Sequence, residues 1–190
     1  MKKLIVSIAA IMVIALGCMA RQPQRGYRGF IEWSNDLRSE YALWFDGKVR
    51  KENLFYTGVS TSHGYQFNPW IFLGGGLMYE KCNNYDRHML SPFVHGRTDL
   101  KFGSFTPFGD VRLGYNLSDG GGVYYSQNIG YRFNWGRKMG VNLGLGLTLQ
   151  GYKYDVVVPD VTPEGYNTLT TVGNGRNCNV YFSFRVGIDF

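Results

Sequence analysis

Two stretches near the end of the chain decide the fold: VNLGLGLTLQ, residues 141–150, and NVYFSFRVGIDF, residues 179–190. In both, every second residue is large and apolar, and the residues between are small, polar or charged. A period of two residues predicts a β-strand with one apolar and one polar face. The alternation alone does not say which face meets water, because a soluble β-sandwich shows the same pattern.

Six more segments with this period precede these two, separated by turn residues. No segment has the apolar period of 3.6 residues that an amphipathic helix needs. The sequence therefore predicts an all-β protein. The predicted strands are 27–35, 53–67, 70–80, 92–102, 105–117, 123–135, 138–154 and 178–190.

The connections between these strands favour a barrel that crosses a membrane. Tight turns alternate with longer links, with one short exception at 118–122. This alternation is typical of transmembrane barrels, and an even strand number leaves both termini on the side of the tight turns, the periplasm. We therefore expect an eight-stranded antiparallel up-and-down transmembrane β-barrel. Its tight turns would be 67–69, 103–104 and 136–137, and its longer loops 36–52, 81–91 and 155–177.

Aromatic residues gather at the ends of the predicted strands, as in the belts that mark the two membrane–water interfaces. One predicted ring holds Tyr65, Phe67, Phe102, Phe105, Phe133, Trp135 and Phe190; the other holds Trp33, Phe55, Tyr79, Tyr115, Tyr125, Tyr152 and Tyr154.

The polar face carries charges of both signs. The lumen of an eight-stranded barrel is narrow enough for side chains to fill, and buried charges are costly unless paired. We expect a plug of ion pairs, with a narrow path for a small solute as the alternative. The predicted lumen network is Glu32, Arg97, Asp99, Asp110, Arg112, Arg132, Arg185 and Asp189.

The N-terminus has the three-part pattern of an export signal. Lys2 and Lys3 precede an uncharged apolar run, 4–16, and small residues follow up to Ala20. The apolar run is shorter than the roughly 20 residues that span a bilayer as a helix. We predict a signal peptide at 1–20 and an outer-membrane barrel domain at 21–190. Lipidation of Cys18 remains an alternative to cleavage after Ala20.

Four short segments and the last strand resemble a known family. They are GYRGF (26–30), TSHGYQFNP (61–69), FGDVRLGY (108–115), LGLGL (143–147) and FSFRVGIDF (182–190). Over nearly all of its mature length the chain resembles the porin-like outer-membrane β-barrels common in Bacteroidetes, of the OmpA/OmpX-like sort. The resemblance implies a place in the bacterial outer membrane, and Phe190 as the end of the signal that the barrel assembly machinery reads. It implies no particular role.

Charge and cysteine usage exclude several classes. Without Lys2 and Lys3 the chain has 18 basic and 14 acidic residues, which alternate rather than cluster, so nucleic-acid binding is not expected. Cys82 and Cys178 have no further ligands at metal-binding spacing, and we predict no metal and no cofactor. A disulfide between them, bridging the mouth of the barrel, stays open.

The histidines do not suggest catalysis. A hydrolase or acyltransferase needs a nucleophile, a base and an orienting group. His63 is predicted to face lipid, His88 to lie in an outer loop near Asp86, and His95 to face the lumen near Arg97. No serine–histidine pair lies where lipid-A deacylase and palmitoyltransferase barrels have theirs. We therefore predict that the protein is not an enzyme, with a lipid-modifying enzyme as a remote alternative.

The first outer loop is the best candidate for contacts outside the cell, because loops on a rigid scaffold carry most binding functions. Its aromatic and basic residues could touch lipid headgroups, lipopolysaccharide phosphates or an unknown surface ligand. We expect a structural or surface-interaction role, with a small-solute channel as the main alternative. The contact candidates are Trp44, Phe45, Lys48, Arg50 and Lys51.

Overall fold

The computed structural model describes most of the region in which strands are predicted. It covers residues 25–45, 48–84, 86–100, 105–118, 121–135, 139–161 and 167–190. Within these ranges the backbone alone is described for 39–45, 48–52, 105, 152–161 and 167–177. The predicted signal peptide, with Cys18, lies outside the described residues.

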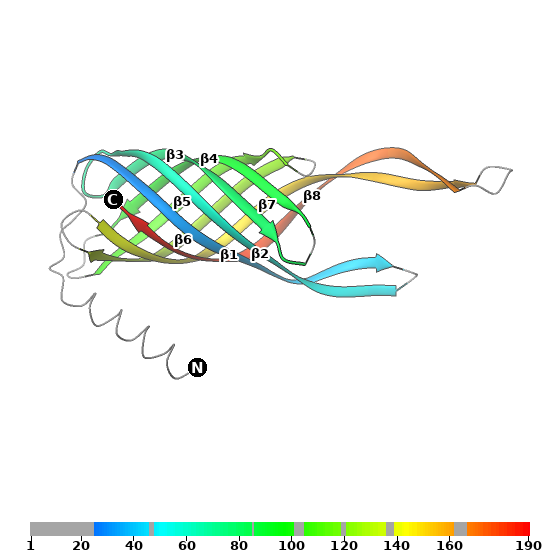
Figure 1. The fold of residues 1–190 in the computed structure, drawn as a ribbon, viewed down its shortest axis with the longest axis horizontal. Helices are drawn as coiled ribbons and strands as arrows, with labels where there is room; N and C mark the ends of the chain where they lie inside the picture. The colour runs from blue at the N-terminus through cyan, green and yellow to red at the C-terminus, as the bar shows by residue number, and fades with distance from the viewer. Residues whose placement is uncertain are drawn as a thin grey trace, which may run out of the picture.

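Eight strands pair in chain order, each antiparallel to its neighbours, and close into one barrel (Figure 1). This confirms the predicted all-β, eight-stranded, up-and-down architecture. The strands are β1 (Gly26–Phe45), β2 (Lys48–Gln66), β3 (Ile71–Cys82), β4 (His88–Asp99), β5 (Phe105–Asn116), β6 (Gly122–Trp135), β7 (Met139–Val161) and β8 (Asn167–Asp189). In the part of the chain that the structure describes, no helix is long and apolar enough to span a membrane.

The barrel closes where β1 pairs with β8, from Phe30 opposite Asp189 to Leu37 opposite Phe182. Following paired residues once around the barrel shows how strongly the strands are staggered. The path starts at Tyr27 and returns to β1 at Leu37, ten residues further on, through Tyr65, Leu73, Gly96, Val111, Gln127, Leu147 and Phe182. A stagger of this kind requires strands tilted by about 35–45° and leaves an interior that side chains can fill.

The two ends of the barrel differ. At one end lie the turn 67–70 and the end of the chain at Phe190, whose backbone N–H and C=O bond to Gly29. The predicted tight turn at 67–69 is confirmed, and those at 103–104 and 136–137 lie outside the described residues. At the other end, β1 and β2 and also β7 and β8 run on past the barrel wall as two arms (Figure 1).

These arms correct the prediction of long loops at 36–52 and 155–177. The β1–β2 pairing continues to Phe45 opposite Lys48, and the β7–β8 pairing continues to Val161 opposite Asn167. We call 41–45 with 48–52 the first ribbon, and 152–161 with 167–177 the second ribbon. In the register of the described residues each ribbon pairs only within itself, so no neighbouring strand flanks it and no apolar alternation is needed, which is why the sequence pattern faded there. The third long loop, 81–91, shrinks to 83–87 because His88–Ser91 belongs to β4.

The two faces of the wall have opposite character. The outward residues are apolar and exposed, for example Val94 at 58%, Leu113 at 57% and Ile129 at 75%. The inward residues are buried, and most of them are polar or charged. The core of this protein is therefore the lumen of the barrel.

Candidate functional site

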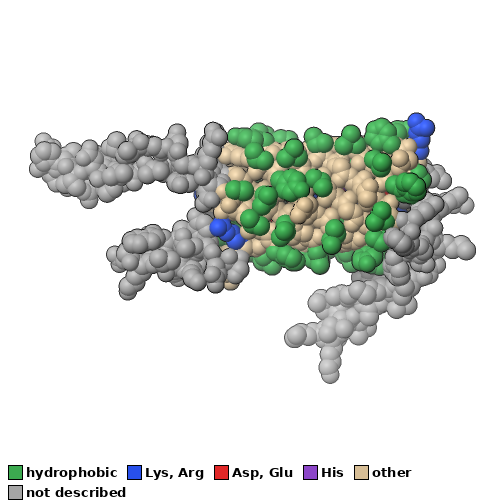
Figure 2. Space-filling model, turned by 180° about the vertical axis from the view of Figure 1, so that it is seen from behind, with side chains coloured by type: hydrophobic (Ala, Val, Ile, Leu, Met, Phe, Trp, Pro, Cys, Tyr) green, Lys and Arg blue, Asp and Glu red, His purple; other side chains and the backbone are tan. Residues whose placement is uncertain are grey.

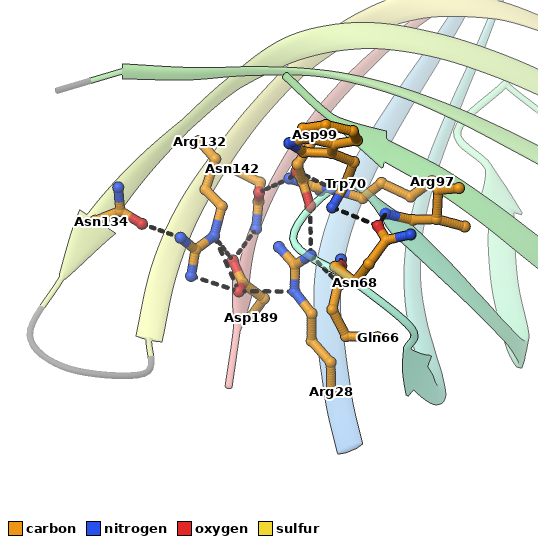
Figure 3. Close-up of polar contacts among 11 residues, drawn as sticks. Arg28, Gln66, Asn68, Trp70, Arg97, Asp99, Arg132, Asn134, Asn142 and Asp189 are labelled. Carbon is orange, nitrogen blue, oxygen red and sulfur yellow. Dashed lines mark hydrogen bonds and ion pairs between the residues drawn. The ribbon is translucent and has the colours of Figure 1, made fainter. Parts of the chain in front are cut away.

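The lumen near the short-turn end is held by a lattice of ion pairs around two carboxylates (Figure 3). Asp189, at the end of β8, accepts from Arg132 at 2.8 Å, from Arg28 at 3.1 Å and from Asn142 at 2.8 Å. Asp99, at the end of β4, accepts from Arg28 at 2.5 Å and from Arg97 at 2.9 Å. Arg28 thus links the two carboxylates.

Amide side chains extend the same lattice. Arg28 also donates to Gln66 at 2.8 Å, Arg97 to Asn142 at 2.8 Å, and Arg132 to Asn134. Asp99 and Asp189 are each 1% exposed, so solvent screening does little to weaken their ion pairs. The lattice ties β1, β2, β4, β6, β7 and β8 together across the interior, and it fills this end of the lumen.

An aromatic layer lies next to the lattice, on the side away from the short turns. The Arg97 guanidinium sits 3.7 Å from the centre of the Phe108 ring, a cation–π contact in a dry site. His95 is fully buried between Phe30, Phe72 and Phe93, whose ring centres lie 5.0–6.3 Å from one another or from the imidazole. Its Nδ1 lies 2.9 Å from the Ser62 hydroxyl.

A second group of charges fills the middle of the lumen. Arg112 of β5 pairs with Glu32 of β1 and hydrogen-bonds to Ser60 at 3.2 Å. Asp110 lies 3.6 Å from Arg112 and 3.6 Å from Arg185. Arg185 also donates to Tyr124 at 2.8 Å and to Ser126 at 2.7 Å.

The third level differs because its charges are acidic. Asp36 of β1 and Glu80 of β3 are each 1% exposed. Glu80 accepts from Gln150 at 2.7 Å, and within the described residues neither carboxylate has an arginine or lysine within ion-pair distance. An apolar cluster closes the lumen beyond them, made of Leu54, Tyr56, Cys82, Met89 and Tyr181.

All eight residues of the predicted lumen network do lie in the lumen, and each is paired. The prediction missed Arg28, Asp36 and Glu80. Arg28 and Asp36 share the parity of Glu32 along β1, so that signal was present, but Asp36 was assigned to a loop. Glu80 lies on the opposite face from the outward residues of β3, and nothing in the sequence indicated that it would meet Asp36.

The three histidines lie in separate places. His63 faces outward as predicted, with Tyr27 at 2.6 Å and Thr61 at 2.9 Å. His88 opens β4 rather than lying in a loop, 2.6 Å from the Tyr79 hydroxyl and 3.1 Å from Asp86. The Ser62–His95 pair is enclosed by rings, which leaves a substrate no access.

The cysteines do not meet. No disulfide joins Cys82, which is buried in the lumen, to Cys178, which is exposed, so the bond that the sequence left open is not formed. Trp44, Phe45, Lys48, Arg50 and Lys51 belong to the first ribbon rather than to a loop. Their side chains lie outside what the structure describes.

The predicted aromatic rings are found on the outer wall wherever their side chains are described. Exposed members at the short-turn end include Phe67 and Trp135, and members toward the other end include Trp33 and Tyr115. Tyr27, Trp70 and Tyr131 add to them and were not predicted as ring members. Phe102 and the side chains of Phe105, Tyr152 and Tyr154 lie outside the described part.

Fold and site together define a closed eight-stranded β-barrel whose lumen is filled mostly by polar and charged side chains. The chain matches no protein-family model and no curated protein.

Proposed function

We propose that this chain is an integral protein of the bacterial outer membrane, with a structural or surface-interaction role, both termini in the periplasm and a plugged lumen. The observation that carries the proposal is the reversed polarity of the wall: apolar side chains point out and charges point in. Figure 2 shows hydrophobic side chains along the whole barrel on one face, with Lys and Arg only near its ends.

In water this arrangement would be unfavourable, because it exposes a large apolar surface to the solvent. Contiguous exposed apolar patches on soluble monomers rarely exceed a few hundred Å², whereas thirty large apolar side chains of the described residues are exposed here. In a bilayer the same surface needs no partner. Closure into a barrel also satisfies the backbone hydrogen bonds, as lipid requires.

The strand dimensions agree with a membrane crossing. β3, β4 and β5 have 12 residues each, and β6 has 14. A rise of about 3.3 Å per residue and a tilt of about 40° give such strands a height of roughly 30 Å, close to the thickness of a hydrocarbon core. The aromatic residues near both ends of the wall fit the two interfaces.

The proposed role rests on two features, the filled lumen and the two ribbons. With its arginines, carboxylates and aromatic rings buried, the lumen serves as a structural plug rather than a path or an active site. The ribbons extend the barrel on the side opposite Phe190 and the start of β1. We propose that they carry the surface contacts, to lipopolysaccharide or to a ligand on the cell exterior, and that the barrel assembly machinery reads the strand ending at Phe190.

Cell fractionation, urea extraction and gel mobility test the membrane assignment. Expressed with its N-terminal segment in a Gram-negative bacterium, the protein should fractionate with the outer membrane, resist extraction by urea, and migrate faster on gels when unheated than when boiled. Protein that stays in the periplasmic wash would contradict the membrane assignment.

Conductance in a planar bilayer tests the plug separately. The folded protein should give no reproducible current steps. Steady steps that change in an Arg112→Ala variant would instead make solute transport the function. Unchanged lipid A on expression is expected as well, and a modification lost in a His88→Ala variant would establish an enzyme.

A further inference from the structure

The fully buried charges of the lumen do not balance within the described residues. Five arginines face six carboxylates: Arg28, Arg97, Arg112, Arg132 and Arg185 against Glu32, Asp36, Glu80, Asp99, Asp110 and Asp189. Every one of these arginines makes its ion pairs with the four carboxylates other than Asp36 and Glu80. Arg38, half-buried toward the mouth, also makes an interaction and is not counted among these five. Among the fully buried charges of the described residues, Asp36 and Glu80 are the two carboxylates outside the ion pairs.

The backbone brings these two carboxylates together. Gly58 of β2 lies between β1 and β3, paired with Ser34 on one side and with Glu80 on the other. A Cβ at Gly58 would lie 2.5 Å from Cγ of Glu80 and 3.0 Å from Oγ of Ser34. Because Gly58 has no side chain, the Glu80 side chain can extend across the inner face of β2 toward β1. On β1, Asp36 follows Ser34 on the same face.

Unpartnered oxygens converge on the same place. Within the described residues, neither carboxylate oxygen of Asp36 has a hydrogen-bond donor in good geometry, and the hydroxyl of Ser34 has no hydrogen-bond partner. Ser34 is 2% exposed and Ser183 is 0% exposed. Ser183 is the register partner of Asp36 on β8, and the two side chains face each other in the lumen. The Ser34 hydroxyl is a further buried oxygen beside Glu80, and an oxygen of this kind can coordinate a cation.

Two neighbouring carboxylates in a dry interior cannot both remain charged without a cation between them. We propose that Asp36 and Glu80 hold one small monovalent metal cation of the Na⁺ class, with the hydroxyl oxygens of Ser34 and Ser183 completing its coordination.

The chemistry of the site selects this occupant among hard cations. A single positive charge equals the imbalance of the buried charges. Ca²⁺ requires six to eight oxygen ligands, and Mg²⁺ keeps several of its waters. Here the buried apolar side chains of Leu54, Tyr56 and Met89 lie on the side toward the ribbons, and they offer no oxygen ligand except the Tyr56 hydroxyl. The inference goes beyond the proposed function and does not rest on it, because it concerns the lumen of the folded barrel wherever that barrel resides.

The test uses the full mature chain, refolded in detergent micelles, in NaCl and in choline chloride at equal concentration and pH. The unfolding midpoint, followed by circular dichroism, should be higher in NaCl and should saturate with its concentration. At roughly five times the dissociation constant the expected shift is about 2–4 °C. Asp36→Asn and Glu80→Gln should each abolish this difference. Asp86→Asn, which removes an exposed carboxylate, should retain it.

Equal midpoints of the unchanged protein in the two salts would overturn the proposal, and so would a Na⁺ effect that survives in Asp36→Asn. A midpoint that follows pH but not Na⁺ would assign a shared proton to the pair in place of a metal ion. If the variants do not refold, line broadening of the ²³Na resonance by the unchanged folded protein decides the question, and its absence counts against the site. Failure to enter membranes, by contrast, would concern only the proposed function.

Discussion

The two ends of the lumen differ in the partners that they give to buried carboxylates. Near the short turns, Asp99 and Asp189 are each held by two arginines. Toward the ribbons, Asp36 and Glu80 have a glutamine, two serines and no guanidinium in ion-pair distance among the described residues. A buried carboxylate is stabilised by its partners and not by burial itself, so removing charge should have opposite effects at the two ends.

The largest expected effect is from Asp189→Asn, which leaves Arg28 and Arg132 facing a neutral group. Breaking a buried pair by removing one partner costs about 3–5 kcal/mol. The midpoint of urea unfolding, measured on protein folded into detergent or bilayers, should fall accordingly. Asp86→Asn is the matched control, because Asp86 is exposed and its loss should leave the midpoint unchanged. An equal effect of both substitutions would contradict the central role of the lattice.

Gly58→Ala should disturb the ribbon end while leaving the lattice intact. Its Cβ would meet the Tyr79 carbonyl oxygen at 2.8 Å as well as the Glu80 side chain, and such overpacking costs about 1–3 kcal/mol. The same denaturation experiment measures the loss. Gly75→Ala is the control, because its nearest neighbour would lie at 3.5 Å, an ordinary contact. If Gly58→Ala is as harmless as Gly75→Ala, Glu80 does not cross β2 in the way described.

Phe108→Leu should cost about 1–2 kcal/mol by removing the ring beneath the Arg97 guanidinium while keeping an apolar side chain. The change isolates the cation–π contact from the ion pairs, since Arg97 retains Asp99. A double-mutant cycle with Arg97→Met measures the coupling between the two side chains. Purely additive effects would show that the ring contributes only its volume.

The smallest effect, and the one of opposite sign, is expected for Asp36→Asn combined with Glu80→Gln. In a medium without Na⁺ this double variant removes two unpaired buried charges and should be as stable as the unchanged protein, or more stable by about 1 kcal/mol. The same urea midpoint measures it. A loss comparable to that of Asp189→Asn would remove the distinction between the two ends of the lumen.

Much of this could be predicted because the strand period separates the two faces residue by residue. The alternation in 179–190 assigned Arg185 and Asp189 to the lumen. The same alternation in two other strands assigned Glu32 and Arg112 to the lumen as well. The ribbons could not be predicted in this way. Beyond the wall no third strand flanks the described pair, so backbone pairing resumes at Tyr41 after a register shift and continues to Phe45 without a hydrophobic pattern to mark it.

The sequence by itself determined the number of strands, their order and the face on which each side chain lies, because these depend on local period and turn residues. Only the tertiary structure decided which inward side chains meet. Arg28 and Asp189 are 161 residues apart, and Arg112 and Glu32 are 80 apart. Their contacts depend on the stagger of ten residues around the closed barrel, which sets the height of every strand relative to the others. That stagger is a property of the closed sheet. Among the described residues it placed a lattice of arginines at one end and, at the other, two carboxylates that make none of the ion pairs.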